Sequence, residues 1–323
     1  MTLPKKQLAL LPSTNIFLSD AKLKPLKVSK DLSVIVSKPV TAPFSFDSLV
    51  LSISAKLQKD SAILLQAAVK TEKGWSGLYK LAYISTNYKK TFDAKEDEFA
   101  KVDIDTLVTK GPASHFKYQI TILGKAKVNM LCAALTNAQG VYDEELALET
   151  LDLKDFEIPV DPISQMEFED RELANKICSP AALTAVMNYY GKKTSLKEAL
   201  CAVYDNNAKI YGTWPLNTAY AAQLGLNAFV VRCCSLAQAE GEIYKGRPLI
   251  VSLGYKKGGL KNAPLSATAG HLLIVTGFDK DGNVIALDPA AKTAADARRV
   301  YNKAQFAEAW LKNKKGLAYA IED

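Results

Sequence analysis

The chain has 323 residues, of which 48% are hydrophobic and 23% charged, and its formal net charge is +7. This composition is typical of a soluble globular protein long enough for two domains, and the charge is too small to predict a nucleic-acid-binding surface. No apolar run approaches the roughly 18 to 20 residues that a membrane span requires, so no span is predicted.

The cysteines predict neither a disulfide scaffold nor a metal site. There are five of them, with no CxxC pair, and the chain has only two histidines. We therefore expect no zinc site and no cofactor. The opening residues, MTLPKKQLALLPS, contain too few apolar side chains for a secretory signal, and the compartment stays open.

The first 155 residues contain runs in which apolar and polar side chains alternate. Such runs are typical of antiparallel strands with one buried face, and other strand-like runs follow, separated by turn residues. The alternating apolar positions are Leu49, Leu51, Ile53 and Ala55, then Phe116, Tyr118, Ile120 and Ile122. We expect a β-sandwich. Its role stays open between binding a glycan, docking a protein partner and bracing the second domain, and Trp75 fits core packing at least as well as a sugar platform.

A change of composition marks the second domain. All five arginines lie beyond residue 170, and the acidic segment at residues 138–162 ends in two prolines. We therefore predict domains at residues 1–155 and 156–323.

The second domain shows helical periodicity first and strands afterwards. Helices are expected at residues 180–190, 195–204 and 216–224, strands at 227–235, 248–253, 271–278 and 283–289, and a last helix at 303–312. Grouping of this kind predicts an α+β fold, with helices first and then an antiparallel sheet.

Cys178 lies at the start of the first of these helices, in KICSPAALTAVMNYYG. Pro180 suits a first helical turn because its missing N–H would have no acceptor there. Free backbone N–H groups and the helix dipole at this end stabilise a thiolate, so Cys178 is a candidate nucleophile. The alternative is a buried structural thiol.

A cysteine nucleophile needs a base, and the second domain has one histidine. His271 opens an apolar strand, whereas His115 lies in the first domain among ordinary polar residues. The segment DKDG after that strand predicts a hairpin. If Phe278 faces Asn283, Asp288 faces Leu273 and becomes a diagonal neighbour of His271 on one sheet face. An aspartate there would orient the imidazole; the alternative is a simple turn at the strand end.

Three motifs, CSPAALTAVMNYYG, GTWPLNTAYAAQLGL and AGHLLIVTGFDKDGNVIALDPAA, resemble the papain-like cysteine peptidases of the bacteriocin-processing, double-glycine-cleaving type. The resemblance covers residues 160–320 and extends to stand-alone members that carry a β-sandwich. It implies that Cys178 is the nucleophile, His271 the general base and acid, and Asp288 the residue that orients His271. It also implies a glutamine whose amide binds the oxyanion, and Gln165 is the candidate.

The sequence departs from the family pattern at this glutamine. Gln165 lies thirteen residues before Cys178, and Glu172 occupies the nearer position. The leading hypothesis is a cysteine hydrolase that cleaves a peptide or amide bond through a thioester. One alternative is acyl transfer by the same residues, and another is a non-catalytic binding or scaffold protein with a papain-like fold.

Overall fold

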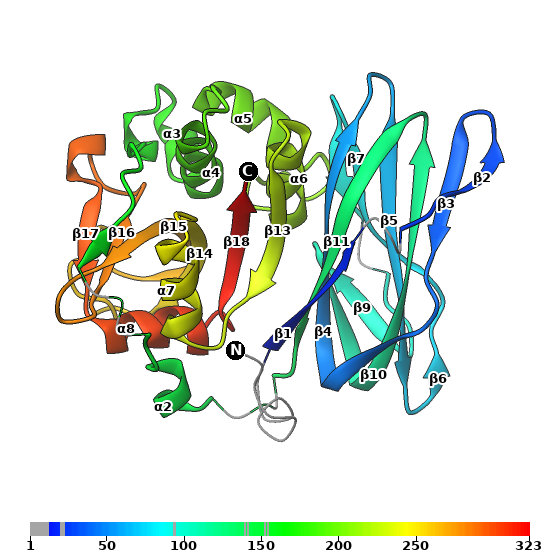
Figure 1. The fold of residues 1–323 in the computed structure, drawn as a ribbon, viewed down its shortest axis with the longest axis horizontal. Coiled ribbons are helices and arrows are strands. Elements are labelled where there is room, and N and C mark those ends of the chain that lie inside the picture. The colour runs from blue at the N-terminus through cyan, green and yellow to red at the C-terminus, as the bar shows by residue number, and fades with distance from the viewer. Residues whose placement is uncertain are drawn as a thin grey trace. The chain divides into compact units, whose positions relative to one another are not determined.

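The computed structural model describes residues 13–19, 23–92, 95–138, 140, 142–151, 153 and 155–323. The chain divides into two compact units, Met1–Val141 with Ala202–Val230 and Tyr142–Cys201 with Val231–Asp323 (Figure 1). The domain boundary at residue 155 stays a prediction. In the described part of the chain, no helix has both the length and the apolar character needed to cross a membrane.

The first unit is built on antiparallel strands. They are β1 (Ser13–Ser19), β2 (Leu26–Ser29), β3 (Leu32–Val36), β4 (Val40–Leu57), β5 (Ala62–Thr71), β6 (Gly74–Trp75), β7 (Tyr79–Ser85), β8 (Lys89–Thr91), β9 (Ala100–Asp103), β10 (Thr106–Leu123) and β11 (Ala126–Thr136). Their main order is β1-β11-β4-β10-β5-β7-β8. Hydrogen bonds connect all of these strands in one continuous sheet, and the sandwich stays a prediction.

Two strands of 18 residues each, β4 and β10, make the sheet continuous. The second half of β4 pairs with β11, whereas its first half pairs with β10, and shifts of register interrupt both ladders. On β10 the alternation holds: Phe116, Tyr118 and Ile120 are buried and the residues between them are partly exposed.

The prediction that only one face of each strand is buried was wrong for the second half of β4. Val50, Ser52 and Ser54 are buried as well as the apolar positions between them. The cause is the segment Ala202–Val230, whose helix α6 (Trp214–Gln223) packs on this strand. Backbone N–H of Val230 donates to Ser52 Oγ at 2.9 Å.

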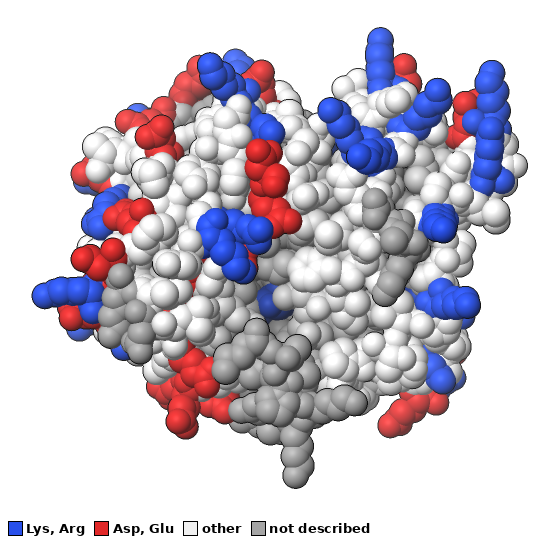
Figure 2. Space-filling model, viewed as in Figure 1, with Lys and Arg blue, Asp and Glu red and all other residues white. Residues whose placement is uncertain are grey.

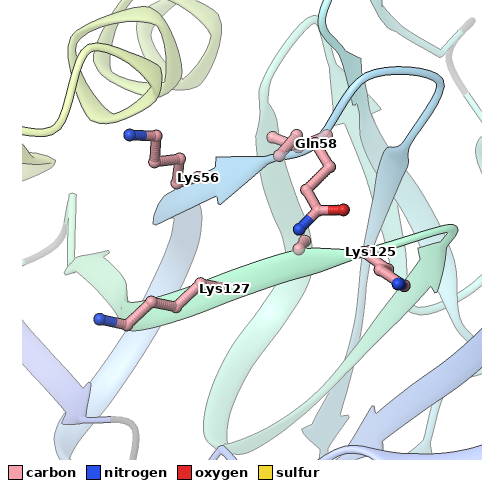
Figure 3. Close-up of a pocket in the computed structure, with 6 residues that line it drawn as sticks. Lys56, Gln58, Lys125 and Lys127 are labelled. Carbon is pink, nitrogen blue, oxygen red and sulfur yellow. The ribbon is translucent and has the colours of Figure 1, made fainter.

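Lysines supply all basic side chains of the sheet, and on the face in Figure 2 they outnumber the acidic ones. Where β4 ends and β11 begins, a hollow of about 300 Å³ is lined by Lys56, Gln58, Lys125 and Lys127, with Leu57 and Ala126 (Figure 3). Lys56 lies directly opposite Lys127 in the ladder. None of the candidate catalytic residues lines this hollow.

The remaining elements follow the first sheet along the chain. They are α2 (Glu144–Ala147), β12 (Phe156–Glu157), η2 (Gln165–Glu167), α3 (Arg171–Ala174), α4 (Cys178–Tyr189), α5 (Leu196–Val203), β13 (Asn227–Arg232), α7 (Leu236–Tyr244), β14 (Leu249–Tyr255), β15 (Thr268–Phe278), β16 (Val284–Leu287), η3 (Ala294–Asp296), β17 (Arg298–Tyr301), α8 (Lys303–Ala307), η4 (Glu308–Lys312) and β18 (Leu317–Glu322). The second sheet has the order β13-β18-β14-β15-β16-β17, with β12 on β15.

The expected helices and strands of this region are present, with differences in order. Helix α7 lies between β13 and β14, so the helices do not all precede the strands. The last helix changes to π-helical hydrogen bonding from Glu308. Strands β17 and β18 were not expected, and β18 lies between the edge strand β13 and β14.

Candidate active site

Cys178 is the first residue of α4, which packs against β15. Ile177 at the N-cap offers no side-chain hydrogen bond, and the first turn has no acidic residue. No side chain therefore caps this turn, and the Ser179 N–H is directed at the Cys178 sulfur. Part of the Cys178 surface stays exposed, as a nucleophile requires.

The C-terminal end of α4 is closed by a glycine. Gly191 has φ +73°, and its N–H donates to the Asn188 carbonyl, while the Lys192 N–H donates to the Met187 carbonyl. This is a Schellman motif, in which a glycine takes the left-handed conformation. All residues from Ser179 to Met187 are buried, so α4 is a rigid support for the thiol.

His271 and Asp288 meet because of the register of the β15–β16 hairpin. The turn is one residue longer than expected, because Phe278 pairs with Val284 and not with Asn283. A bulge at Thr276 absorbs the difference, and Ile274 pairs with Leu287. Continued by one residue, this register puts Asp288 level with Leu273, the alignment expected from the sequence.

The contacts of the pair are short and buried. His271 Nε2 lies 2.7 Å from Asp288 Oδ1, and the two residues are 2% and 1% exposed. Since Nε2 is engaged, Nδ1 is the ring nitrogen left for the hydrogen bond with the Cys178 sulfur. The backbone N–H of Leu272 also donates to this sulfur.

These contacts favour a charged pair. Burial favours the neutral thiol, but the hydrogen bond and charge of His271, with the N–H groups of Leu272 and Ser179, lower the pKa of Cys178. Burial likewise opposes the imidazolium, but Asp288 and the Cys178 sulfur outweigh it and raise the pKa of His271 to about 10. A thiolate facing an imidazolium is the nucleophilic form of such a pair.

Asp288 stays ionised in this environment. Burial disfavours its charge, but the imidazolium of His271 and the donors around the carboxylate lower its pKa. These donors include the Ala290 N–H at 2.9 Å and the Tyr301 hydroxyl at 2.8 Å. Neither donor was expected from the sequence, because a backbone N–H in a turn and a tyrosine on a short strand carry no motif.

Gln165 lies in η2 and is docked on the loop that follows Asp288. Its N–H donates to the Pro289 carbonyl at 2.8 Å, and Ser164 Oγ donates to the Ala291 carbonyl at 2.6 Å. The side-chain amide Nε2 donates to the Ala174 carbonyl at 2.6 Å, four residues before Cys178. The structure thus brings Cys178, His271 and Asp288 into contact and connects Gln165 to them through backbone.

The other candidates from the sequence have local roles. Glu172 is exposed on α3. His115 bonds to Ser114 Oγ at 2.8 Å and its ring lies beside Trp75. Among the described residues, no group of three or more His, Cys, Asp or Glu could hold a metal ion.

Two family models match the chain over separate ranges. Residues 157–317 match the Peptidase C39 like family, and residues 14–134 match the Peptidase C39 N-terminal domain. The chain belongs to the C39-like peptidase family. No curated protein matches it.

Three solved structures of peptidases or putative peptidases are similar to part of this chain. A putative C39-like peptidase from Bacillus anthracis is 14% identical, with 53% of this chain and 98% of that chain covered and a TM-score of 0.40. A double-glycine-motif protease from an AMS/PCAT transporter, solved with a leader peptide, is 20% identical, with coverages of 52% and 94% and a TM-score of 0.35. The peptidase domain of Streptococcus ComA is 18% identical, with coverages of 46% and 92% and a TM-score of 0.33.

Proposed function

We propose that this C39-like protein is a cysteine peptidase that cleaves a peptide or amide bond through a thioester on Cys178. The observation that carries the proposal is the contact of the Cys178 sulfur with the buried His271–Asp288 pair. A nucleophile, a base and a residue that orients the base are the minimum set for acyl transfer.

The reaction begins with the thiolate. The Cys178 sulfur attacks the carbonyl carbon, the C=O electron pair moves to oxygen, and a tetrahedral oxyanion forms. The imidazolium of His271 then gives its proton to the leaving amine as the C–N bond breaks. Water attacks the thioester, His271 accepts a proton from it, and the acid product leaves with the thiolate restored.

The oxyanion needs donors during both steps. The Cys178 N–H belongs to the first helical residue and has no acceptor within α4, so it is one donor. The second amide hydrogen of Gln165 Nε2 is the other, because the first is engaged by the Ala174 carbonyl. Such a donor contributes about 2.7 to 4 kcal/mol in acyl transfer.

The test compares wild type with Cys178→Ala on a peptide library, with products identified by mass spectrometry. Cys178→Ala should lose cleavage by at least about a thousandfold. Cys201→Ala, which removes an exposed cysteine on α5, is the matched control and should cleave as wild type does. Equal cleavage by Cys178→Ala would refute the proposal, and products extended by an added amine would assign acyl transfer instead.

A further inference from the structure

The two carboxylate oxygens of Asp288 are held by different groups. Oδ1 accepts from His271 Nε2 at 2.7 Å and from the Ala290 N–H at 2.9 Å. Oδ2 accepts from the Tyr301 hydroxyl at 2.8 Å, its one hydrogen bond among the described residues. Since the residue is buried, an ionised oxygen without a donor would be costly, and Tyr301 satisfies it.

Tyr301 is itself fixed in place. It is fully buried on β17, pairs with Val284 of β16, and its ring stacks on Phe306 with 5.8 Å between centroids. Burial and the nearby charge of Asp288 raise the pKa of Tyr301 above its usual value, so the hydroxyl keeps its proton and remains a donor.

We propose that Tyr301 is a positioning residue, whose hydroxyl holds the Asp288 carboxylate in the rotation that directs Oδ1 at His271. The terminal torsion of an aspartate is broad, so a carboxylate held only through Oδ1 could turn about its own bond. A donor on Oδ2 removes this freedom and with it fixes the ring of His271 toward Cys178. The inference rests on the proposed function, yet the reactivity of the thiol tests it without any substrate.

The titratable groups around Asp288 come from several elements. They are His271 on β15, Tyr301 on β17 and Tyr255 on β14, with Arg299 acting on Tyr301 and Cys178 acting on His271. Loss of the Tyr301 hydroxyl would raise the pKa of Asp288. The carboxylate would then become neutral at a higher pH, and the charged Cys178–His271 pair would be lost there as pH falls.

The experiment measures the rate of Cys178 alkylation by iodoacetamide from about pH 4 to about pH 9. Tyr301→Phe keeps the ring and its stack, so the fold should persist. The acid limb of its alkylation-rate profile should move to higher pH by about one unit. Alkylation of Tyr301→Phe should therefore be about tenfold slower than that of wild type at the acid end of the range and little changed at neutral pH. The control Tyr190→Phe removes a hydroxyl that donates to the Ile321 carbonyl at 2.8 Å, and it should match wild type.

A double-mutant cycle separates positioning from a general structural effect. In the Asp288→Asn background, Tyr301→Phe should shift the alkylation profile no further, because the carboxylate through which it acts is absent. An unshifted acid limb in Tyr301→Phe, or the same shift in both backgrounds, would overturn the inference. Wild type that shows the expected alkylation profile but cleaves no peptide would contradict the proposed function and leave the role of Tyr301 standing.

Discussion

The ring of His271 has one nitrogen for each of its neighbours. Nε2 is bonded to Asp288 Oδ1, which leaves Nδ1 for the Cys178 sulfur. This arrangement fixes which nitrogen can exchange a proton with the thiol, because the aspartate holds the other. It also makes the protonation of His271 depend on the charge of Asp288, which has a consequence for stability.

Asp288→Asn should lower the free energy of unfolding by about 2 kcal/mol at pH 6, because the buried imidazolium loses its counter-charge. A histidine whose folded pKa is raised stabilises the fold fully below its unfolded pKa of about 6.5 and ceases to do so as pH rises through the folded value. The pKa of His271 is raised to about 10, so the deficit of Asp288→Asn should shrink between those limits.

Urea unfolding at about pH 6 and about pH 10 measures this deficit. Asp281→Asn, at an exposed position in the turn of the same hairpin, is the control and should show no such trend. A deficit that is equal at both pH values would mean that His271 is not held as an imidazolium.

Residues at the site differ in how far the sequence could predict them. Cys178 precedes a proline-marked helix start, and His271 and Asp288 follow from hairpin register, so local rules reach all three. Tyr301 lies thirteen residues beyond Asp288 on a four-residue strand, RRVY, whose pairing depends on the rest of the sheet. No local pattern distinguishes such a tyrosine from an ordinary core residue.

At the scale of elements, the β15–β16 hairpin reached the expected alignment by an unexpected route. The expected Phe278–Asn283 pair is replaced by Phe278–Val284, and the bulge at Thr276 restores the register before His271. Bulges insert one residue on one strand and are not marked by composition, so the sequence predicts the face but not the bulge. Helix α7 was not predicted. It lies between strands β13 and β14, whereas the predicted order placed the helices of this region before its strands.

Strand β12 depends on Gly277 of β15. A Cβ at this glycine would lie 2.3 Å from the Phe156 carbonyl oxygen and 2.8 Å from the Glu157 Cα. Gly277→Ala should therefore push β12 from β15 and lower the free energy of unfolding by about 1 to 3 kcal/mol. Gly111→Ala, in a strand position with nothing within 4 Å, is the control for urea unfolding. Equal free energies of unfolding for the two variants would mean that β12 can move away from β15 without destabilising the fold.

At the scale of the whole molecule, the segment Ala202–Val230 joins the first sheet although it lies inside the range of the peptidase-like family model. Asp205 is fully buried there and accepts from Thr91 Oγ1 at 2.7 Å and from Thr213 Oγ1 at 2.9 Å. The amide of Gln223 pairs with both backbone groups of Leu57, at 2.8 and 2.9 Å. These contacts make the sheet part of the structure of this segment.

A fragment of residues 142–323 should consequently fail to fold as the full chain does. Without the sheet, the apolar side of α6 is exposed, and the buried Asp205 loses its bonds to Thr91, a loss of several kcal/mol in total. Circular dichroism and thermal unfolding should show no cooperative transition, and iodoacetamide should label the buried Cys233 and Cys234 as readily as Cys178. A fragment that unfolds cooperatively and still labels first at Cys178 would show that the sheet is a separable module. Binding of a glycan or a protein partner would then be favoured as the role of the sheet.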